Sequence, residues 1–269
     1  PLWMGVVLLI SLVCGGSALA QSAGDGLPVT AQVAAEPTVV DEQNALLGEI
    51  AREKKQIERL QTQLLSSEGL AAEILTQRQD RLWISLFRNT LLVARSVLES
   101  ESTSGEVTAA REEVVADLRV LPDEAYTAMG RLRDAIEFPA ADVAPQVFVV
   151  ADQKLLKREL ELNEIFRVLL DYLELAPGFG LEIESQRQAL IDIILESGAN
   201  RSAFLELAIS NAQVLSPAAA TLPSNTDLAD ALAAAEARIV LAGRNLNETV
   251  GLMNKLELDT THYRQQIIK

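Results

Sequence analysis

The sequence predicts an all-α protein, an extended multi-helix bundle that begins with a heptad-like helix or a helical hairpin. Of its 269 residues, 49% are hydrophobic but only 4% are aromatic, a mixture rich in Leu, Ala and Glu that favours helices packed on helices. The apolar residues recur at three-, four- and seven-residue steps, which is the helical period. No two segments read as a pair of strands. We expect about eight helices and room for one or two cores.

The first twenty residues read as an export signal. An uncharged apolar run over residues 6–14 leads to small residues ending at Ala18 and Ala20, and Gln21 follows. This order is typical of a signal peptide and its cleavage site. The alternative is an uncleaved anchor, although residues 4–20 are shorter than the ~20 apolar residues that span a bilayer. The chain starts without Met or a basic segment, so we expect it to derive from a longer precursor.

Four further segments follow from the composition. Residues 21–40 are small, polar and Pro-containing, which indicates a flexible leader. Residues 41–120 are expected to form a heptad-like arm and hairpin, and residues 121–255 a helical bundle. Residues 256–269 are expected to form a short terminal helix. The only cysteine lies in the signal segment, so no disulfide framework is expected after cleavage.

The first helix should start near Asp41, a residue type that caps helices well. Its apolar residues follow a heptad with mixed charges on the other faces, a pattern shared by parallel coiled coils and antiparallel hairpins. Glu53 and Ser67 occupy core positions of this heptad and make it imperfect. The residues expected to form the packing interface are Ile50, Ile57, Leu60 and Leu64.

The second helix is expected over about 70–98, with Trp83 and Phe87 as neighbouring core anchors. Further helices are predicted to begin near residues 103–106 and 121–123. The segment 147–150 is β-branched, but a lone strand has no partner, so we assign it to the start of a helix.

The clearest amphipathic helix after the first covers residues 151–175 and should stop at 176–180, where Pro and Gly occur. The remaining expectations are helices at about 182–196 and 201–215 joined through 197–200, a loop framed by Pro217 and Pro223, a long helix from Asn225-Thr226 to about Met253, and a short helix after Asp259.

The sequence contains few residues that could act in catalysis or bind a ligand. A net charge of −15 argues against nucleic-acid partners. The one histidine, His262, has no neighbouring group that would complete a triad or a metal site, so we assign it to the surface. Glu159 and Glu161 are two residues apart on a helix and point in different directions, so we expect a solvated face rather than paired acids. The sequence predicts no cofactor, no metal and no enzymatic activity.

The last nineteen residues hold the most informative pattern. Asp259 can cap a helix in which Tyr263 and Ile267 are i,i+4 partners, and Arg264 lies in its later turns. An amphipathic helix with Tyr and basic residues suits a position close to a membrane. The residues that carry the pattern are Leu258, Asp259, Thr260, Tyr263, Arg264, Gln265 and Ile267.

This tail resembles the segment that precedes the membrane helices in large bacterial members of the small-conductance mechanosensitive channel (MscS) family. The resemblance implies a tension-gated pore of the inner membrane that protects against osmotic downshock. This chain would be its periplasmic scaffold or sensor, acting as a homo-oligomer with a transmembrane region of its own that lies outside this chain. The alternative is a free periplasmic adaptor or chaperone-like protein that binds a partner through its coiled-coil-like arm.

Overall fold

A computed structural model describes residues 39–99, 105–136, 145–221 and 226–268. The expected cleavage residues Ala18, Ala20 and Gln21, and almost all of the expected leader, lie outside these ranges. The chain from residue 38 onward forms one compact unit, and the following description concerns that unit.

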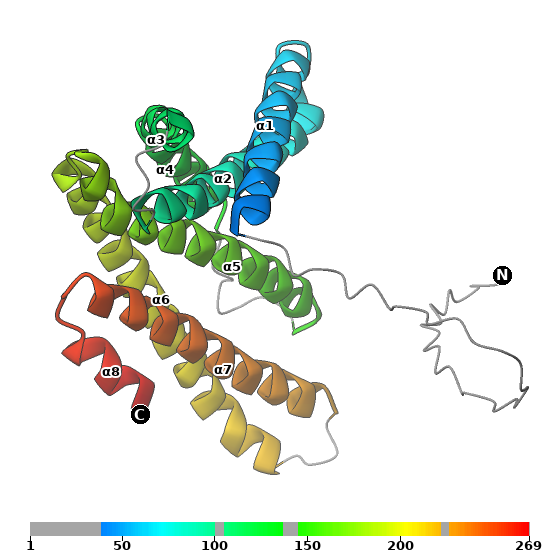
Figure 1. Ribbon diagram of the computed structural model, residues 1–269. Coiled ribbons are helices and arrows are strands. Elements are labelled where there is room, and N and C mark those ends of the chain that lie inside the picture. Colours follow the sequence, from blue (N-terminus) through cyan, green and yellow to red (C-terminus); the bar gives the residue numbers. More distant parts are fainter. Residues whose placement is uncertain (1–38, 100–104, 137–144, 222–225, 269) are drawn as a thin grey trace, which may run out of the picture. The chain divides into compact units, whose positions relative to one another are not determined.

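The described residues are mostly helical and contain no strand, which confirms the predicted all-α class (Figure 1). The segment 147–150 belongs to a helix, as predicted. The helices in order are α1 (Val39–Leu64), α2 (Gly69–Glu99), α3 (Gly105–Leu118), α4 (Leu121–Asp134), α5 (Pro145–Leu175), the 3-10 turn η1 (Ala176–Phe179), α6 (Glu184–Thr221), α7 (Thr226–Lys255) and α8 (Thr261–Ile268).

The heptad-like helix forms an antiparallel hairpin within the chain. The turn between α1 and α2 is closed by the hydroxyls of Ser66 and Ser67, which donate to the carbonyl oxygen of Gln63 at 3.1 and 2.8 Å. Gly69 then starts α2 with φ +57°, a conformation that favours glycine. Ile50 and Ile57 are buried within the chain. Leu60 and Leu64 are half-buried.

The polar residue in the heptad core is satisfied across the hairpin. The carboxylate of Glu53 accepts hydrogen bonds from the Ser85 hydroxyl at 2.5 Å and from the Asn89 amide at 3.0 Å. Both donors lie on α2, and Asn89 is itself buried. This bridge compensates the desolvation of Glu53 and fixes which residues of α2 face α1.

The main core is shared by α2, α4 and α5, and it runs across the boundary expected at residue 120. Phe87 is fully buried with its ring centroid 5.7 Å from that of Tyr172, whereas Trp83 packs half-buried at the edge of the core. Helix α5 ends at Leu175, directly before the predicted stop at 176–180, and Gly180 caps the following turn η1 with φ +74° and an N–H hydrogen bond to the Pro177 carbonyl.

Helices α6 and α7 pair along much of their length, and α7 also packs on α5 (Figure 1). A smaller apolar cluster lies between these helices, and the edge of α8 packs on it. Its buried members are Leu155, Phe204, Leu205, Ala242 and Leu246.

Three helix boundaries differ from the prediction. Residues 182–215 were expected as two helices, but α6 is continuous through Gly198. A Cβ at Gly198 would lie 2.5 Å from the methyl of Met253 and 3.4 Å from the Tyr263 ring, so this glycine admits close packing rather than a break. Pro217 lies inside the end of α6, not in a loop. Helix α1 begins at Val39, so Asp41 lies within it and is not its cap.

The hairpin packing gives a stability prediction. Ile57 is 2% exposed, so Ile57→Asp places an unpaired carboxylate in the core and should lower the free energy of unfolding by about 3 kcal/mol. The matched control is Leu65→Asp at the hairpin turn, where the side chain is 90% exposed. Chemical denaturation followed by circular dichroism measures both variants. Equal stability of the two would contradict the burial of Ile57.

Candidate functional site

A buried arginine joins α5, α6 and α7. Arg201 on α6 is 2% exposed and is the largest fully buried side chain in the described residues. Its guanidinium forms an ion pair with Glu159 of α5. It also donates to Asn163 Oδ1 at 2.9 Å and to the hydroxyl of Thr249 on α7. One side chain therefore bonds directly to both neighbouring helices.

The polar contacts continue from this centre to the surface. Asn163 donates through its amide to Glu248 Oε2 at 2.5 Å. Glu248 also lies 3.5 Å from Arg167 and 3.6 Å from Arg244. The buried arginine and its partners, Glu159, Asn163, Arg201, Glu248 and Thr249, are called the Arg201 junction below.

Burial sets the electrostatics of the junction. It raises the pKa of the Glu159 carboxyl, and the nearby Arg201 charge only partly opposes this shift. It also lowers the pKa of Arg201, against the pull of Glu159. Burying the two charges together costs free energy, and the hydrogen bonds to Asn163 and Thr249 offset part of that cost. This arrangement suits a clamp that fixes helix positions.

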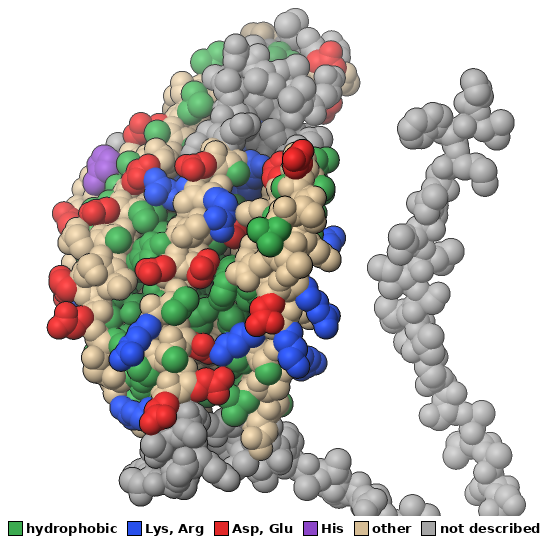
Figure 2. Space-filling view, turned by 90° about the horizontal axis from the view of Figure 1, so that it is seen from above, with side chains coloured by type: hydrophobic (Ala, Val, Ile, Leu, Met, Phe, Trp, Pro, Cys, Tyr) green, Lys and Arg blue, Asp and Glu red, His purple; other side chains and the backbone are tan. Residues whose placement is uncertain are grey.

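The expectation that Glu159 lies on a solvated face is therefore wrong. The helical periodicity could have revealed the burial of Glu159. This residue lies four positions after Leu155 and three before Leu162, on the same apolar stripe as Phe166. An acid on an apolar stripe requires a buried partner. That this partner is Arg201, 42 positions further along, is not visible in the sequence. The other predicted surface residue, His262, is exposed, as expected (Figure 2).

The C-terminal residues singled out by the sequence lie in α8 and in the segment directly before it. Asp259 accepts hydrogen bonds from the backbone N–H of Thr261 at 3.0 Å and from its hydroxyl at 2.7 Å. The backbone hydrogen bond makes the larger contribution, and both bonds lower the pKa of the Asp259 carboxyl. The predicted capping role of Asp259 thus has the expected geometry.

Helix α8 is docked on α6 and α7. Tyr263 and Ile267 are half-buried and pack on the core clusters. Arg264 donates to Asn254 Oδ1 at 3.0 Å, which ties α8 to the end of α7. Gln266 is buried, accepts from Ser202 and donates to Glu206 at 2.6 Å on α6. The tail is therefore held by apolar packing and by side-chain hydrogen bonds to two helices.

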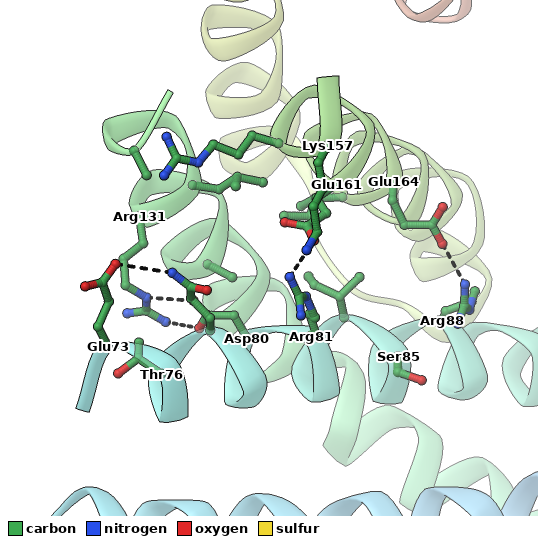
Figure 3. A pocket seen from close by; sticks show the side chains of 17 residues that line it. Glu73, Thr76, Asp80, Arg81, Ser85, Arg88, Arg131, Lys157, Glu161 and Glu164 are labelled. Carbon is green, nitrogen blue, oxygen red and sulfur yellow. Dashed lines mark hydrogen bonds and ion pairs between the residues drawn. The ribbon is translucent and has the colours of Figure 1, made fainter. Parts of the chain in front are cut away.

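A groove of about 640 Å³ lies between α2, α4 and α5 (Figure 3). Three ion pairs line it. Arg81 pairs with Glu161 and Arg88 with Glu164, each at 2.6 Å, and these two pairs connect α2 to α5. Arg131 of α4 pairs with Asp80 of α2. Apolar side chains lie between the charges, and no motif in the sequence indicated this groove.

Comparisons with protein-family models, with curated proteins and with solved structures found no match to this chain. Across the ranges that the structure describes, no helix is both long enough and apolar enough to cross a bilayer. The same ranges hold no cluster of three His, Cys, Asp or Glu side chains arranged to bind a metal ion.

Replacing Arg201 should lower the free energy of unfolding by an amount that depends on pH. In Arg201→Met, Glu159 is buried without a counter-charge, which should cost about 3 kcal/mol at pH 7. Because the folded-state pKa of Glu159 is raised, its contribution to stability is greatest below its ordinary value of 4.5 and declines as pH rises. The loss should therefore shrink toward pH 5.

Urea unfolding at several pH values measures this effect. Arg187→Met on the same helix, at a half-exposed position, is the matched control. Adding Glu159→Gln to Arg201→Met should restore part of the stability at pH 7, because it removes the uncompensated charge. A double variant less stable than Arg201→Met would contradict this account.

The pKa of Asp259 is shifted in the opposite direction to that of Glu159, so its effect on stability has the opposite pH dependence. Its pKa is lowered in the fold, so its contribution to α8 is present above the ordinary value of 3.8 and is lost as pH falls through the folded pKa. A carbon-13 NMR titration should find the Asp259 pKa below 3.8. Thr261→Ala removes the hydroxyl donor and should raise that pKa; no change would exclude the hydroxyl as a cause.

Proposed function

We propose that this chain is the periplasmic scaffold of a tension-gated channel of the MscS family, at the periplasmic face of the bacterial inner membrane. The observation that carries the proposal is the tail. Among the residues that resemble the pre-membrane phrase of that family, Asp259 caps α8, Tyr263 and Ile267 pack it on the core clusters, and Arg264 bonds it to α7. Such anchoring supports a load-bearing connection to a following membrane segment.

The contacts supply a continuous mechanical path. A displacement of α8 acts on α6 through Tyr263 and Gln266 and on α7 through Arg264. The Arg201 junction connects α6 and α7 to α5, and the ion pairs of Arg81 and Arg88 connect α5 to α2. In this mechanism the helices act as rigid levers. They bias a channel toward its closed or open state to the extent that their contacts differ between the two states.

The gene sequence beyond Lys269 is the first test of the channel proposal. We expect the codons that follow Lys269 to encode apolar segments of about 20 residues. Deleting the whole gene, in a strain that lacks its other mechanosensitive channels, should reduce survival of osmotic downshock, and the complete reading frame should restore survival. A stop codon directly after Lys269 in the native gene would exclude the channel.

Variants of the anchor test the mechanical role. In the complete protein, Tyr263→Ala with Arg264→Ala should uncouple α8 and shift the membrane tension at which half of the channels open. The control is Gln265→Ala, since Gln265 is exposed. Patch-clamp recording of membrane patches measures the threshold. An identical threshold for the double variant and the control would contradict transmission through α8.

A second candidate is a free periplasmic adaptor that binds a partner protein through its α1–α2 arm. The observation that favours it is apolar exposure beside the hairpin turn, where Leu65 is 90% and Leu70 is 71% exposed. In that case, replacing both with Ser would abolish partner binding and leave the fold stable, and the native reading frame would stop at Lys269.

A further inference from the structure

The groove between α2, α4 and α5 has an apolar floor and a charged rim (Figure 3). Ile84, Leu132 and Ile165 contribute large apolar side chains, and Ala128 and Ala135 leave space beside them. A volume of about 640 Å³ lies in the range of pockets that hold small organic ligands. The groove is therefore large enough for a molecule with an apolar part of several carbon atoms.

The charges of the rim are not all paired. Arg81, Arg88 and Arg131 are each committed to a carboxylate. Lys157 and Arg158 are neighbours on α5 and also line the groove, and neither has a charged partner within the part of the chain that the structure describes. Among the described residues, the groove thus keeps two adjacent cations that form no ion pair with a carboxylate.

The contrast with the rest of the chain is marked. Five basic and four acidic side chains line the groove, whereas the whole chain carries a net charge of −15. Of the four acids, Asp80, Glu161 and Glu164 are paired with arginines, whereas Glu73 accepts a hydrogen bond from the neutral Gln77 amide at 3.4 Å and keeps its negative charge. An anion that enters here meets a locally positive rim on an otherwise acidic protein.

We propose that this groove binds an anionic amphiphile, a phosphate ester with an apolar tail. The phosphate lies at the rim beside Lys157, and the positive charge of Arg158 on the next position of α5 adds to its attraction. The tail lies over Ile84, Leu132 and Ile165 and is removed from water there. A lipid headgroup region with part of its acyl chain and a soluble organophosphate share this chemistry. The inference concerns the chain itself and does not depend on the channel assignment.

Calorimetric titration of the purified chain with octyl phosphate, below its micelle concentration, tests the proposal. We expect saturable binding at one site that weakens as salt is raised, because the phosphate contacts lie at a partly exposed rim. Inorganic phosphate, which lacks the tail, should bind at least tenfold more weakly. Absence of saturable octyl phosphate binding, or equal affinity for the two probes, would overturn the proposal.

Variants assign the site. Lys157→Ala with Arg158→Ala should weaken octyl phosphate binding by about tenfold, since two rim charges are lost. The matched control, Lys55→Ala with Arg119→Ala, removes the same charge from exposed positions outside the groove. Ala135→Leu fills part of the floor and should weaken binding of octyl phosphate but not of inorganic phosphate. Equal affinities for the two double variants would overturn the site.

Circular dichroism melting of each variant separates loss of binding from loss of fold.

A second experiment distinguishes a lipid ligand from a soluble one. Co-sedimentation with vesicles of phosphatidylcholine and phosphatidic acid, lost in the Lys157→Ala/Arg158→Ala variant, assigns the ligand to a lipid. Octyl phosphate binding without co-sedimentation supports the groove with a soluble organophosphate as its ligand.

Discussion

The three long helices α5, α6 and α7 depend on one buried cation. A guanidinium removed from water must be paired and hydrogen-bonded, and Arg201 finds its acceptors only where Glu159, Asn163 and Thr249 converge. A shift of α6 by one turn would leave both the cation and Glu159 without partners. Apolar side chains alone tolerate such slips better, so the junction specifies the helix positions more than it adds stability.

The terminal helix depends on these positions in turn. Tyr263 of α8 and Met253 of α7 both pack beside Gly198, where the missing Cβ lets them approach the unbroken helix α6 closely. Gln266 bonds to Ser202 and Glu206, one and two turns further along α6. Helix α8 is therefore fixed relative to the Arg201 junction, as the proposed scaffold role requires.

The groove owes its shape to different forces. Its ion pairs between Arg81 and Glu161 and between Arg88 and Glu164 are partly exposed, and such pairs contribute little stability. Its walls are held by the core of α2, α4 and α5, in which Phe87 and Phe166 are fully buried. A rigid core can therefore present Lys157 and Arg158, which have no carboxylate partner among the described residues, without relying on them for folding.

The sequence by itself determined the helical class, the hairpin residues Ile50 and Ile57 and the cap at Asp259, because local spacing encodes which face of a helix is apolar and where it starts. It did not determine whether Gly198 breaks a helix, since a glycine serves equally for a turn and for close packing. Only the tertiary structure decided that question and paired Glu159 with Arg201. Partners 42 positions apart leave no periodic signal, and their meeting depends on how three helices pack.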